Sequence, residues 1–173
     1  MNAVAFVRLV ADWLGNASTG INARLATIPL DGTDVAPAAL TVLDETRDLD
    51  TALGRLPEAT SRPCAQVALT AESEETPPSQ SVPTREFTAT VGIRLALSNA
   101  QAASGARDLY YYAKATLESL RALHAADETG RTRGQVYLEA PTDTLRIATM
   151  GVIEHDETVT ALITVRYTGR DQS

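Results

Sequence analysis

The sequence has few aromatic residues and very little lysine. Aromatic side chains account for 5% of the 173 residues, so a hydrophobic core must be built mainly from Val, Leu, Ile and Ala. Lys114 is the only lysine, and arginine carries the rest of the basic charge. The 15 basic and 22 acidic residues leave a net charge of −7. Because proteins bind phosphate backbones through Lys and Arg, this balance argues against a nucleic-acid-binding function.

The sequence also lacks the residue clusters that support catalysis or metal binding. Cys64 has no second cysteine as a disulfide partner, and a lone cysteine is more often a small core residue than a nucleophile. His124 and His155 have no second His or Cys at ligand spacing. There is no glycine-rich phosphate loop and no nucleophile elbow. We therefore predict no catalytic residue, no metal and no cofactor.

Two helical segments are predicted near the N-terminus. Residues 2–14 carry apolar residues at three- and four-residue spacing, which is typical of an amphipathic helix. This segment is too short to span a membrane and is interrupted by Arg8 and Asp12, so we predict no membrane segment. A short helical turn from about 20 to 27 follows, and Asp31-Gly32 then predicts a turn.

The strongest pattern in the sequence is the strict alternation of residues 84–97. Six apolar residues occupy every second position there: Phe87, Ala89, Val91, Ile93, Leu95 and Leu97. Side chains in a strand alternate between faces, so we expect this stripe to face a core and the other face to meet solvent or a partner. A long helix is predicted from near Ser98 to about 127. Its apolar side is assigned to seven residues: Ala106, Leu109, Tyr110, Ala113, Leu117, Leu120 and His124.

Further strands are predicted at 39–44, 62–72, 134–140, 145–152 and 159–167. Runs of strands joined by turns, with helices between the runs, are typical of an α+β fold. We predict one α+β domain over 1–173. It has a mixed, mostly antiparallel sheet, an N-terminal helix and one long helix packed on one face, and an extended hairpin arm. Residues 170–173 are predicted to be a polar tail.

A polar and acidic segment separates the strands at 62–72 and 84–97. It contains Glu74, Glu75, Pro77 and Pro78, and it cannot bury enough apolar surface to order itself well. We interpret 72–83 as a flexible hairpin arm. An ordinary loop and an arm that orders on a partner are equally open, and the second alternative makes these four residues interface candidates.

The run of three tyrosines, Tyr110, Tyr111 and Tyr112, is unusual in a chain with so few aromatics. Consecutive helical residues spread over about 200° of the surface, so at least one tyrosine should be exposed. Tyrosine is favoured at protein interfaces because it is amphipathic. We name Tyr111 and Tyr112 as candidate partner contacts. The alternative is that the tyrosines pack the helix against the sheet and loops.

Three segments together resemble a family of phage proteins. They are GINARLATIPLDG at 20–32, VLDETRD at 42–48 and RDLYY at 107–111, placed between an N-terminal helix and closing antiparallel strands. This order is similar to that of the tail-terminator or tail-completion proteins of long-tailed bacteriophages, and more loosely to other head-to-tail joining proteins. The resemblance covers most of the chain and includes no catalytic motif.

The resemblance implies a structural virion protein that assembles with itself into a ring, probably a hexamer in that family. The ring would cap the tail-tube protein and join it to the head–tail connector or stopper. It would be assembled in the host cytoplasm and located in the tail or neck. DNA would pass through its bore without specific binding, which a charge of −7 suits.

Two other functions remain open from the sequence. The segment 29–62 holds five prolines or glycines between Pro29 and Pro57, which is more extended chain than a minimal terminator needs. It leaves room for a connector protein of the neck, either a stopper or an adaptor. A cytoplasmic α+β domain that binds a small ligand is the alternative of a different class, and it predicts a concave apolar pocket.

Overall fold

A computed structural model describes residues 3–46, 62–75, 84–98, 102–128, 135–138, 146–153 and 156–172. Its elements, in chain order, are α1 (Ala3–Gly15), α2 (Ile21–Leu25), β1 (Thr41–Asp44), β2 (Cys64–Glu75), β3 (Thr84–Ser98), α3 (Ala102–Glu128), β4 (Gln135–Leu138), β5 (Arg146–Ile153) and β6 (Asp156–Gln172). The predicted order of helix, strands, long helix and strands is confirmed.

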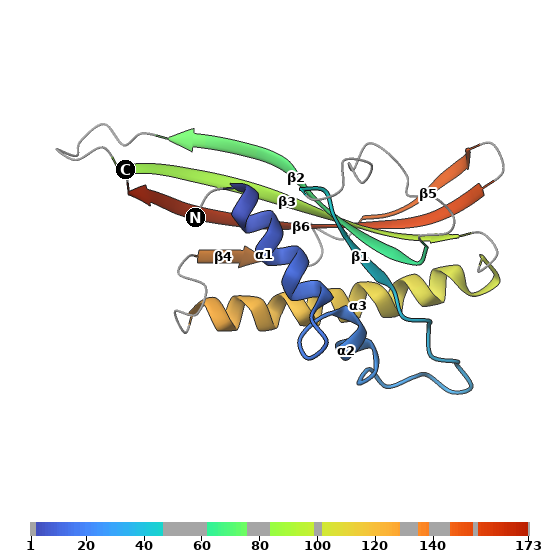
Figure 1. The fold of residues 1–173 in the computed structure, drawn as a ribbon. Coiled ribbons are helices and arrows are strands. Elements are labelled where there is room, and N and C mark those ends of the chain that lie inside the picture. Colours follow the sequence, from blue (N-terminus) through green and yellow to red (C-terminus); the bar gives the residue numbers. More distant parts are fainter. Residues whose placement is uncertain are drawn as a thin grey trace.

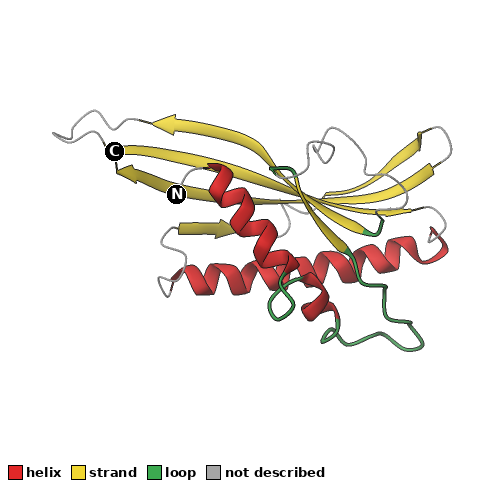
Figure 2. Ribbon diagram, viewed as in Figure 1, coloured by secondary structure: helices red, strands yellow, loops and turns green. Residues whose placement is uncertain are grey.

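The six strands form one mixed sheet in the order β1-β2-β3-β6-β4, and β5 also pairs with β6. Only β1 and β2 run parallel, and every other pair is antiparallel. Helix α1 packs on β1, β2 and β3, while α3 packs on β3, β4 and β6 and also contacts α1 (Figures 1 and 2). The chain therefore has an α+β fold with its two longest helices against the sheet.

The core lies between the sheet and these helices. The alternating apolar residues of β3 from Ala89 to Leu97 are at most 1% exposed, which confirms the predicted stripe over that range. Large side chains from both helices complete the same cluster: Phe6, Val10, Leu14, Leu109, Tyr112, Leu120 and Leu123. Burial of apolar surface on this scale is the main source of folding free energy.

The opposite face of the sheet is also buried at its centre. Cys64, Gln66 and Ala68 of β2 and Ala96 of β3 are at most 1% exposed. The prediction that this face meets solvent or a partner is therefore wrong in the middle of the sheet. The alternation on β3 did not indicate this, because Gly92 and Ala96 are too small to show by themselves whether a face is covered.

Strand β2 contains a bulge at Thr70. Leu69 pairs with Val91, but Ala71 pairs with Thr90, so β2 holds one residue more than β3 at this point. The Thr70 hydroxyl donates a hydrogen bond to the carbonyl oxygen of Thr90 at 2.9 Å. A bulge shifts the alternation of the residues that follow. The sequence predicts Ala71 on the same face as Ala65, Val67 and Leu69, and the bulge makes that prediction wrong.

At one end, the sheet narrows to a three-stranded ribbon made of β2, β3 and β6. Strand β1 pairs with β2 only as far as Val67, and β4 pairs with β6 only over 165–168. The ribbon continues to the pairs of Glu75 with Glu86 and of Gln172 with Thr84. Figure 1 shows this end running beyond α3 and β4. We call β2 from Ala68, together with its partners in β3 and β6, the ribbon.

The ribbon changes two predictions about the chain. Residues 72–75, predicted as the start of a flexible arm, belong to β2 and pair with β3. Residues 170–172, predicted as a polar tail, belong to β6 and pair with the first residues of β3. Backbone pairing extends both strands beyond the residues that alternate between apolar and polar. That alternation was the signal from which the ends of these strands were predicted. Residues 76–83 lie outside the described part.

Candidate interaction surface

The segment 29–40, which we call the strap, joins α2 to β1 without regular secondary structure. It turns at Asp31–Asp34, where the Asp34 N–H donates to the Asp31 carbonyl oxygen at 3.0 Å. Gly32 occupies the left-handed region with φ of +55°, a conformation that glycine adopts without a steric cost. The predicted Asp31-Gly32 turn is thereby confirmed.

Two buried tyrosines of α3 hold the strap. The Tyr111 hydroxyl accepts a hydrogen bond from the Asp31 N–H at 3.0 Å and donates one to Asp34 Oδ2 at 2.8 Å. The Tyr112 hydroxyl donates to the Ala38 carbonyl oxygen at 2.6 Å. The hydrogen bond from the Asp31 N–H lowers the pKa of Tyr111. The Asp34 carboxylate and burial raise it by more in total, so the pKa of Tyr111 lies above its usual value.

Charged groups continue this contact between the strap and α3. Arg107 donates from Nε and Nη2 to Asp108 Oδ1, at 3.0 and 2.9 Å, and from Nη1 to Asp34 Oδ1 at 3.4 Å. The hydrogen bond to Asp108 is the main reason that the pKa of Arg107 is raised. The strap is therefore fixed to α3 by tyrosine hydroxyls and by one arginine between two carboxylates.

Asn22 of α2 fixes the end of the strap where it enters the sheet. Its side-chain amide donates from Nδ2 to the Leu40 carbonyl oxygen and accepts from the Leu40 N–H, both at 2.9 Å. This pair of bonds repeats the pattern by which two strands pair. The Asn22 side chain thus satisfies both the N–H and the C=O of Leu40, the residue directly before β1.

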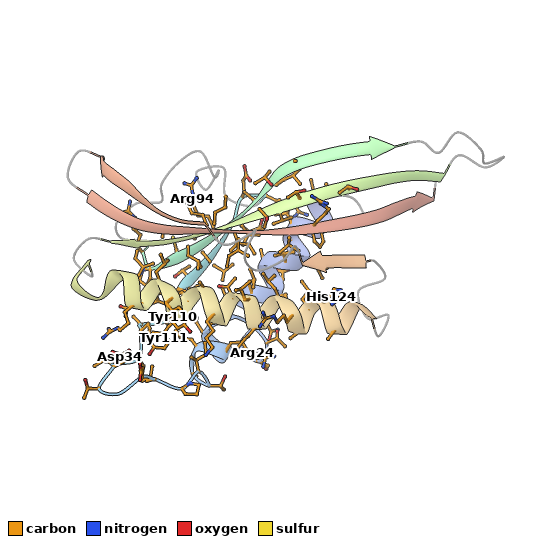
Figure 3. The ribbon with its side chains drawn as sticks, turned by 180° about the vertical axis from the view of Figure 1, so that it is seen from behind. Arg24, Asp34, Arg94, Tyr110, Tyr111 and His124 are labelled. Carbon is orange, nitrogen blue, oxygen red and sulfur yellow. The ribbon has the colours of Figure 1, made fainter. Side chains whose placement is uncertain are left out.

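Tyr110 points away from this buried network. It is 58% exposed, whereas Tyr111 and Tyr112 are 4% and 2% exposed. Figure 3 shows Tyr110, Tyr111 and Asp34 together on the side of α3 away from the sheet. The rings of Tyr110 and Tyr111 meet edge to face with centroids 5.7 Å apart, a favourable aromatic geometry. Tyr110 therefore exposes an aromatic ring that packs on Tyr111, whose position is fixed by its hydrogen bonds to the strap.

Apolar side chains of the strap are also exposed, next to the turn that Tyr111 holds. Within the described residues, four large hydrophobic side chains are exposed, and Leu30, Val35 and Tyr110 are three of them. Leu30 and Val35 flank the turn that Tyr111 holds. On α3, Lys114 and Arg121 lie four and eleven residues beyond Tyr110. This spacing places them on the same face of the helix as Tyr110. We call Leu30, Val35, Tyr110, Lys114 and Arg121 the Tyr110 surface.

The structure revises the tyrosine prediction. Tyr111 and Tyr112 were proposed from the sequence as partner contacts, but both are buried in contacts within the subunit, which is the packing alternative. The expectation that at least one tyrosine is exposed is confirmed by Tyr110, which the sequence placed wrongly on the apolar side. The spacing of Arg107, Tyr110 and Lys114 was the signal that indicates the exposed side.

Buried polar residues explain why the apolar side of α3 was misplaced. Thr116 and Ser119 are fully buried, and each hydroxyl donates at 2.7 Å to a carbonyl oxygen, of Tyr112 and of Thr19 respectively. A hydroxyl that is satisfied in this way is tolerated in a core. Because the sequence pattern counts Thr and Ser as polar, it shifted the predicted face toward Tyr110.

The other candidate interface residues are on or near the ribbon. Glu74 and Glu75 belong to β2, where they pair with Phe87 and Glu86 of β3. Pro77 and Pro78 lie outside the described residues. The structure therefore brings the glutamates to the end of the sheet and does not bring them to the tyrosines of α3.

Substitution of the two neighbouring tyrosines should separate packing from exposure. Tyr111→Ala removes a buried ring and both hydroxyl contacts to the strap, so we expect a loss of about 3–5 kcal/mol in the free energy of unfolding. Tyr110→Ala should change it by less than about 0.5 kcal/mol, because the side chain is mostly exposed. Urea unfolding of the two variants measures both values. Equal losses would contradict the assignment.

Cys64 lies on the sheet face opposite to α3, in the region where β2 pairs with β3. Burial raises the pKa of its thiol from 9.0 to about 11, although Arg62 and Arg94 oppose this change. Figure 3 shows Arg94 on the same side of the sheet, away from α3. Burial also lowers the pKa of Arg94. A thiol that stays protonated at neutral pH is a poor nucleophile, so Cys64 fits the predicted core role.

Alkaline pH should destabilise the protein through two buried groups. Burial, with the nearby charge of Asp108, raises the pKa of Tyr112 from 10.0 to about 12, and the Cys64 pKa is about 11. The folded state thus keeps protons that the unfolded chain loses near pH 9 and 10. The stability from these groups is complete below pH 9 and falls as pH rises toward 12.

Urea midpoints measured at a series of pH values test this effect. We expect the midpoint of the wild type to decline from about pH 9 upward. Tyr112→Phe should flatten the part of the decline above pH 10, and Cys64→Ala the part between 9 and 11. Parallel declines in all three proteins would show that other groups cause it.

The described residues contain neither a metal-ligand cluster nor a membrane-spanning helix. None of them form a group of three or more His, Cys, Asp or Glu side chains that could hold a metal ion. No helix within the described ranges combines the length and the apolar character that crossing a bilayer requires. His124 lies in α3, and His155 is outside the described part. No protein-family model matches this chain, and neither does any curated protein.

Proposed function

We propose that this protein is a structural subunit of a long-tailed phage virion, a tail terminator. Its copies form a ring that caps the tail tube and joins it to the head connector. The observation that carries the proposal is the ribbon, which extends the sheet beyond its helices and whose β2 edge pairs with no described strand on its outer side. The resemblance of segments 20–32, 42–48 and 107–111 to terminator proteins supports a terminator ring as the assembly in which the ribbon takes part.

The edge of β2 is the feature suited to assembly. From Ala68 onward, no strand of the described ranges pairs with its outer side. The N–H and C=O groups of such an edge readily pair with a strand from another chain. Strand addition of this kind gives affinity through main-chain hydrogen bonds and needs no pocket. A neighbouring subunit or a tube subunit can supply that strand.

The charge of the chain fits a ring through which DNA passes. Each subunit carries −7, so a ring of several copies has a strongly negative field. Repulsion keeps the phosphate backbone from binding to the bore wall, and DNA can then slide. The proposal assigns no catalytic residue, and the buried Cys64 thiol with its raised pKa agrees with this assignment.

A connector of the neck is the second candidate. The strap favours it, because it is an extended segment fixed to α3 at Asp31, Asp34 and Ala38, outside the sheet. A rigid, exposed segment of this kind can meet a second protein ring. A terminator and a connector differ in the component of the particle that they bind: a terminator binds the tail tube, and a connector binds the portal side of the head.

Binding to isolated particle components distinguishes the two functions. Purified protein is mixed with tail tubes that lack a terminator, and separately with DNA-filled heads that carry a portal, and both are imaged by electron microscopy. The terminator proposal predicts a ring at one end of each tube and none on the heads. Rings on the heads alone would support the connector. Binding to neither component would overturn both.

A further inference from the structure

The two outer strands of the ribbon, β2 and β6, both reach its end without a described strand on their outer sides. Strand β1 pairs with β2 only as far as Val67, and β4 pairs with β6 only as far as Thr168. Both outer strands are antiparallel to β3, so they run in the same direction, and Figure 1 shows their arrowheads at the same end. Glu75 of β2 and Arg170 of β6 are both opposite Glu86, so the two edges lie at the same level.

One hydrogen bond shows which backbone groups of β2 point outward. The Thr90 carbonyl oxygen accepts from a hydroxyl of β2, so the backbone groups of Thr90 point toward β2. These groups alternate between the two sides of a strand, so those of Thr88 point toward β2 as well. Directly opposed residues of an antiparallel pair point either both toward each other or both away. Ser73, opposite Thr88, therefore points toward β3, and the N–H and C=O groups of Glu72 and Glu74 point outward.

The same alternation identifies the outward groups of β6. Because Thr90 points toward β2, its partner Arg166 points away from β3 and toward β4. Arg170 and Gln172 follow at even spacing, so their N–H and C=O groups also point away from β3, beyond the last pair with β4. Each edge of the ribbon end therefore presents outward donors and acceptors at alternate residues. Such groups readily pair with a strand of another chain.

A second copy of this chain is the partner that matches both edges. Strands β2 and β6 present the same kind of backbone groups, at the same level and in the same direction, on opposite sides of one ribbon. A copy turned about a ring axis therefore brings its β2 alongside the neighbour's β6 as a parallel strand. Contact between two different edges is heterologous, so it repeats from copy to copy until the ring closes. Pairing of β2 with β2 would instead give a two-fold dimer.

We infer that neighbouring subunits join their sheets edge to edge, with β6 of one copy pairing in parallel with β2 of the next. The inference rests on the proposed ring function and names the strands that build the ring. One register joins the outward residues in a single run, and it places Arg170 beside Ser73. The Arg170 N–H then donates to the Glu72 carbonyl oxygen, and the Arg170 carbonyl oxygen accepts from the Glu74 N–H. The Glu74 carbonyl oxygen accepts in turn from the Gln172 N–H.

Cross-linking between single-cysteine proteins tests the strand pair. In a Cys64→Ala background, one protein carries Ser73→Cys and another carries Arg170→Cys. After oxidation of the mixture, we expect a disulfide-linked dimer on a denaturing gel, and single chains from either protein alone. Asp171→Cys in place of Arg170→Cys is the control and should give little dimer, because neighbouring positions of a strand belong to opposite faces. A dimer from Ser73→Cys alone would indicate β2–β2 pairing and overturn the inference, as would a mixture that forms rings but no dimer.

Proline substitution tests the backbone contact separately. Glu74→Pro and Gln172→Pro each remove an outward N–H that the inferred contact uses, and each leaves the hydrogen bonds to β3 in place. We expect each variant to need about a tenfold or greater increase in concentration for half-assembly, measured by light scattering. Glu74→Ala is the matched control, because it removes the same side chain but keeps the N–H, and it should assemble like the wild type.

The outcomes separate the inference from the ring function. Urea midpoints verify that each proline variant is folded, and the cross-linking result decides for any variant that is not. Rings from folded Glu74→Pro at the wild-type concentration would overturn the inference and leave the ring function intact. A wild-type protein that never assembles would overturn both.

Discussion

Replacing Leu95 with aspartate is expected to abolish cooperative folding. Leu95 has no exposed surface, and it lies in the middle of β3 between Ala65 of β2 and Ala161 of β6. An uncompensated buried charge costs several kcal/mol. The lost leucine packing adds about 2–5 kcal/mol. Their sum is comparable with the whole stability of a typical domain, about 5–15 kcal/mol.

Circular dichroism and gel filtration of Leu95→Asp measure this effect. We expect loss of the cooperative urea transition, and expression mainly as aggregate. Thr88→Asp, on the other face of the same strand and half-buried, is the matched control. It should remain folded with a loss near 1 kcal/mol, which reflects the poor strand propensity of aspartate. A folded Leu95→Asp protein would mean that β3 has a different register.

Gly20→Ala should also have a large effect, because the fold leaves no room for a side chain at this position. A Cβ atom at this position would lie 2.2 Å from the Leu14 carbonyl oxygen and 2.5 Å from the Asn16 carbonyl oxygen. Both are backbone atoms, so no side-chain rotation can relieve the contact. The backbone φ of −75° is ordinary, so lack of space, and not conformation, demands glycine here. We expect a loss of about 3 kcal/mol or more in the free energy of unfolding.

Two other glycines serve as controls for Gly20. At Gly15 a Cβ would be 3.7 Å from the nearest atom, an ordinary contact, so Gly15→Ala should be close to neutral. Gly32 has open space around it but a φ of +55°, so Gly32→Ala should cost about 1–2 kcal/mol. Thermal unfolding of the three variants should rank Gly20 first, Gly32 second and Gly15 last. Another order would contradict the steric account.

The elements of the fold were readable from the sequence because their patterns are strong. The alternation from Ala89 to Leu97 corresponds to one buried face, and the spacing over 2–14 corresponds to α1. The parallel pairing of β1 with β2 and the extent of the ribbon were not readable. Both depend on backbone hydrogen bonds between segments far apart in the chain. Such bonds produce no repeating pattern of apolar and polar residues in the sequence.

The candidate surface was only partly predictable. The tyrosine run identified the right turn of α3, but the exposed member is Tyr110, while Tyr111 and Tyr112 bind the strap. Satisfied hydroxyls at Thr116 and Ser119 hid the true buried side. The bulge at Thr70 likewise moved Ala71 to the other face. In each case a hydrogen bond that the sequence does not reveal decided the position of a side chain.

The mass of the purified protein in solution tests the central claim most directly. Native mass spectrometry across a concentration series, with negative-stain images of the same samples, reports whether subunits close into a ring. The account predicts one dominant species with a fixed number of copies, six if the likeness to tail terminators holds, and images with an open centre. A single subunit mass at the highest soluble concentration, with no rings on the grid, would contradict it.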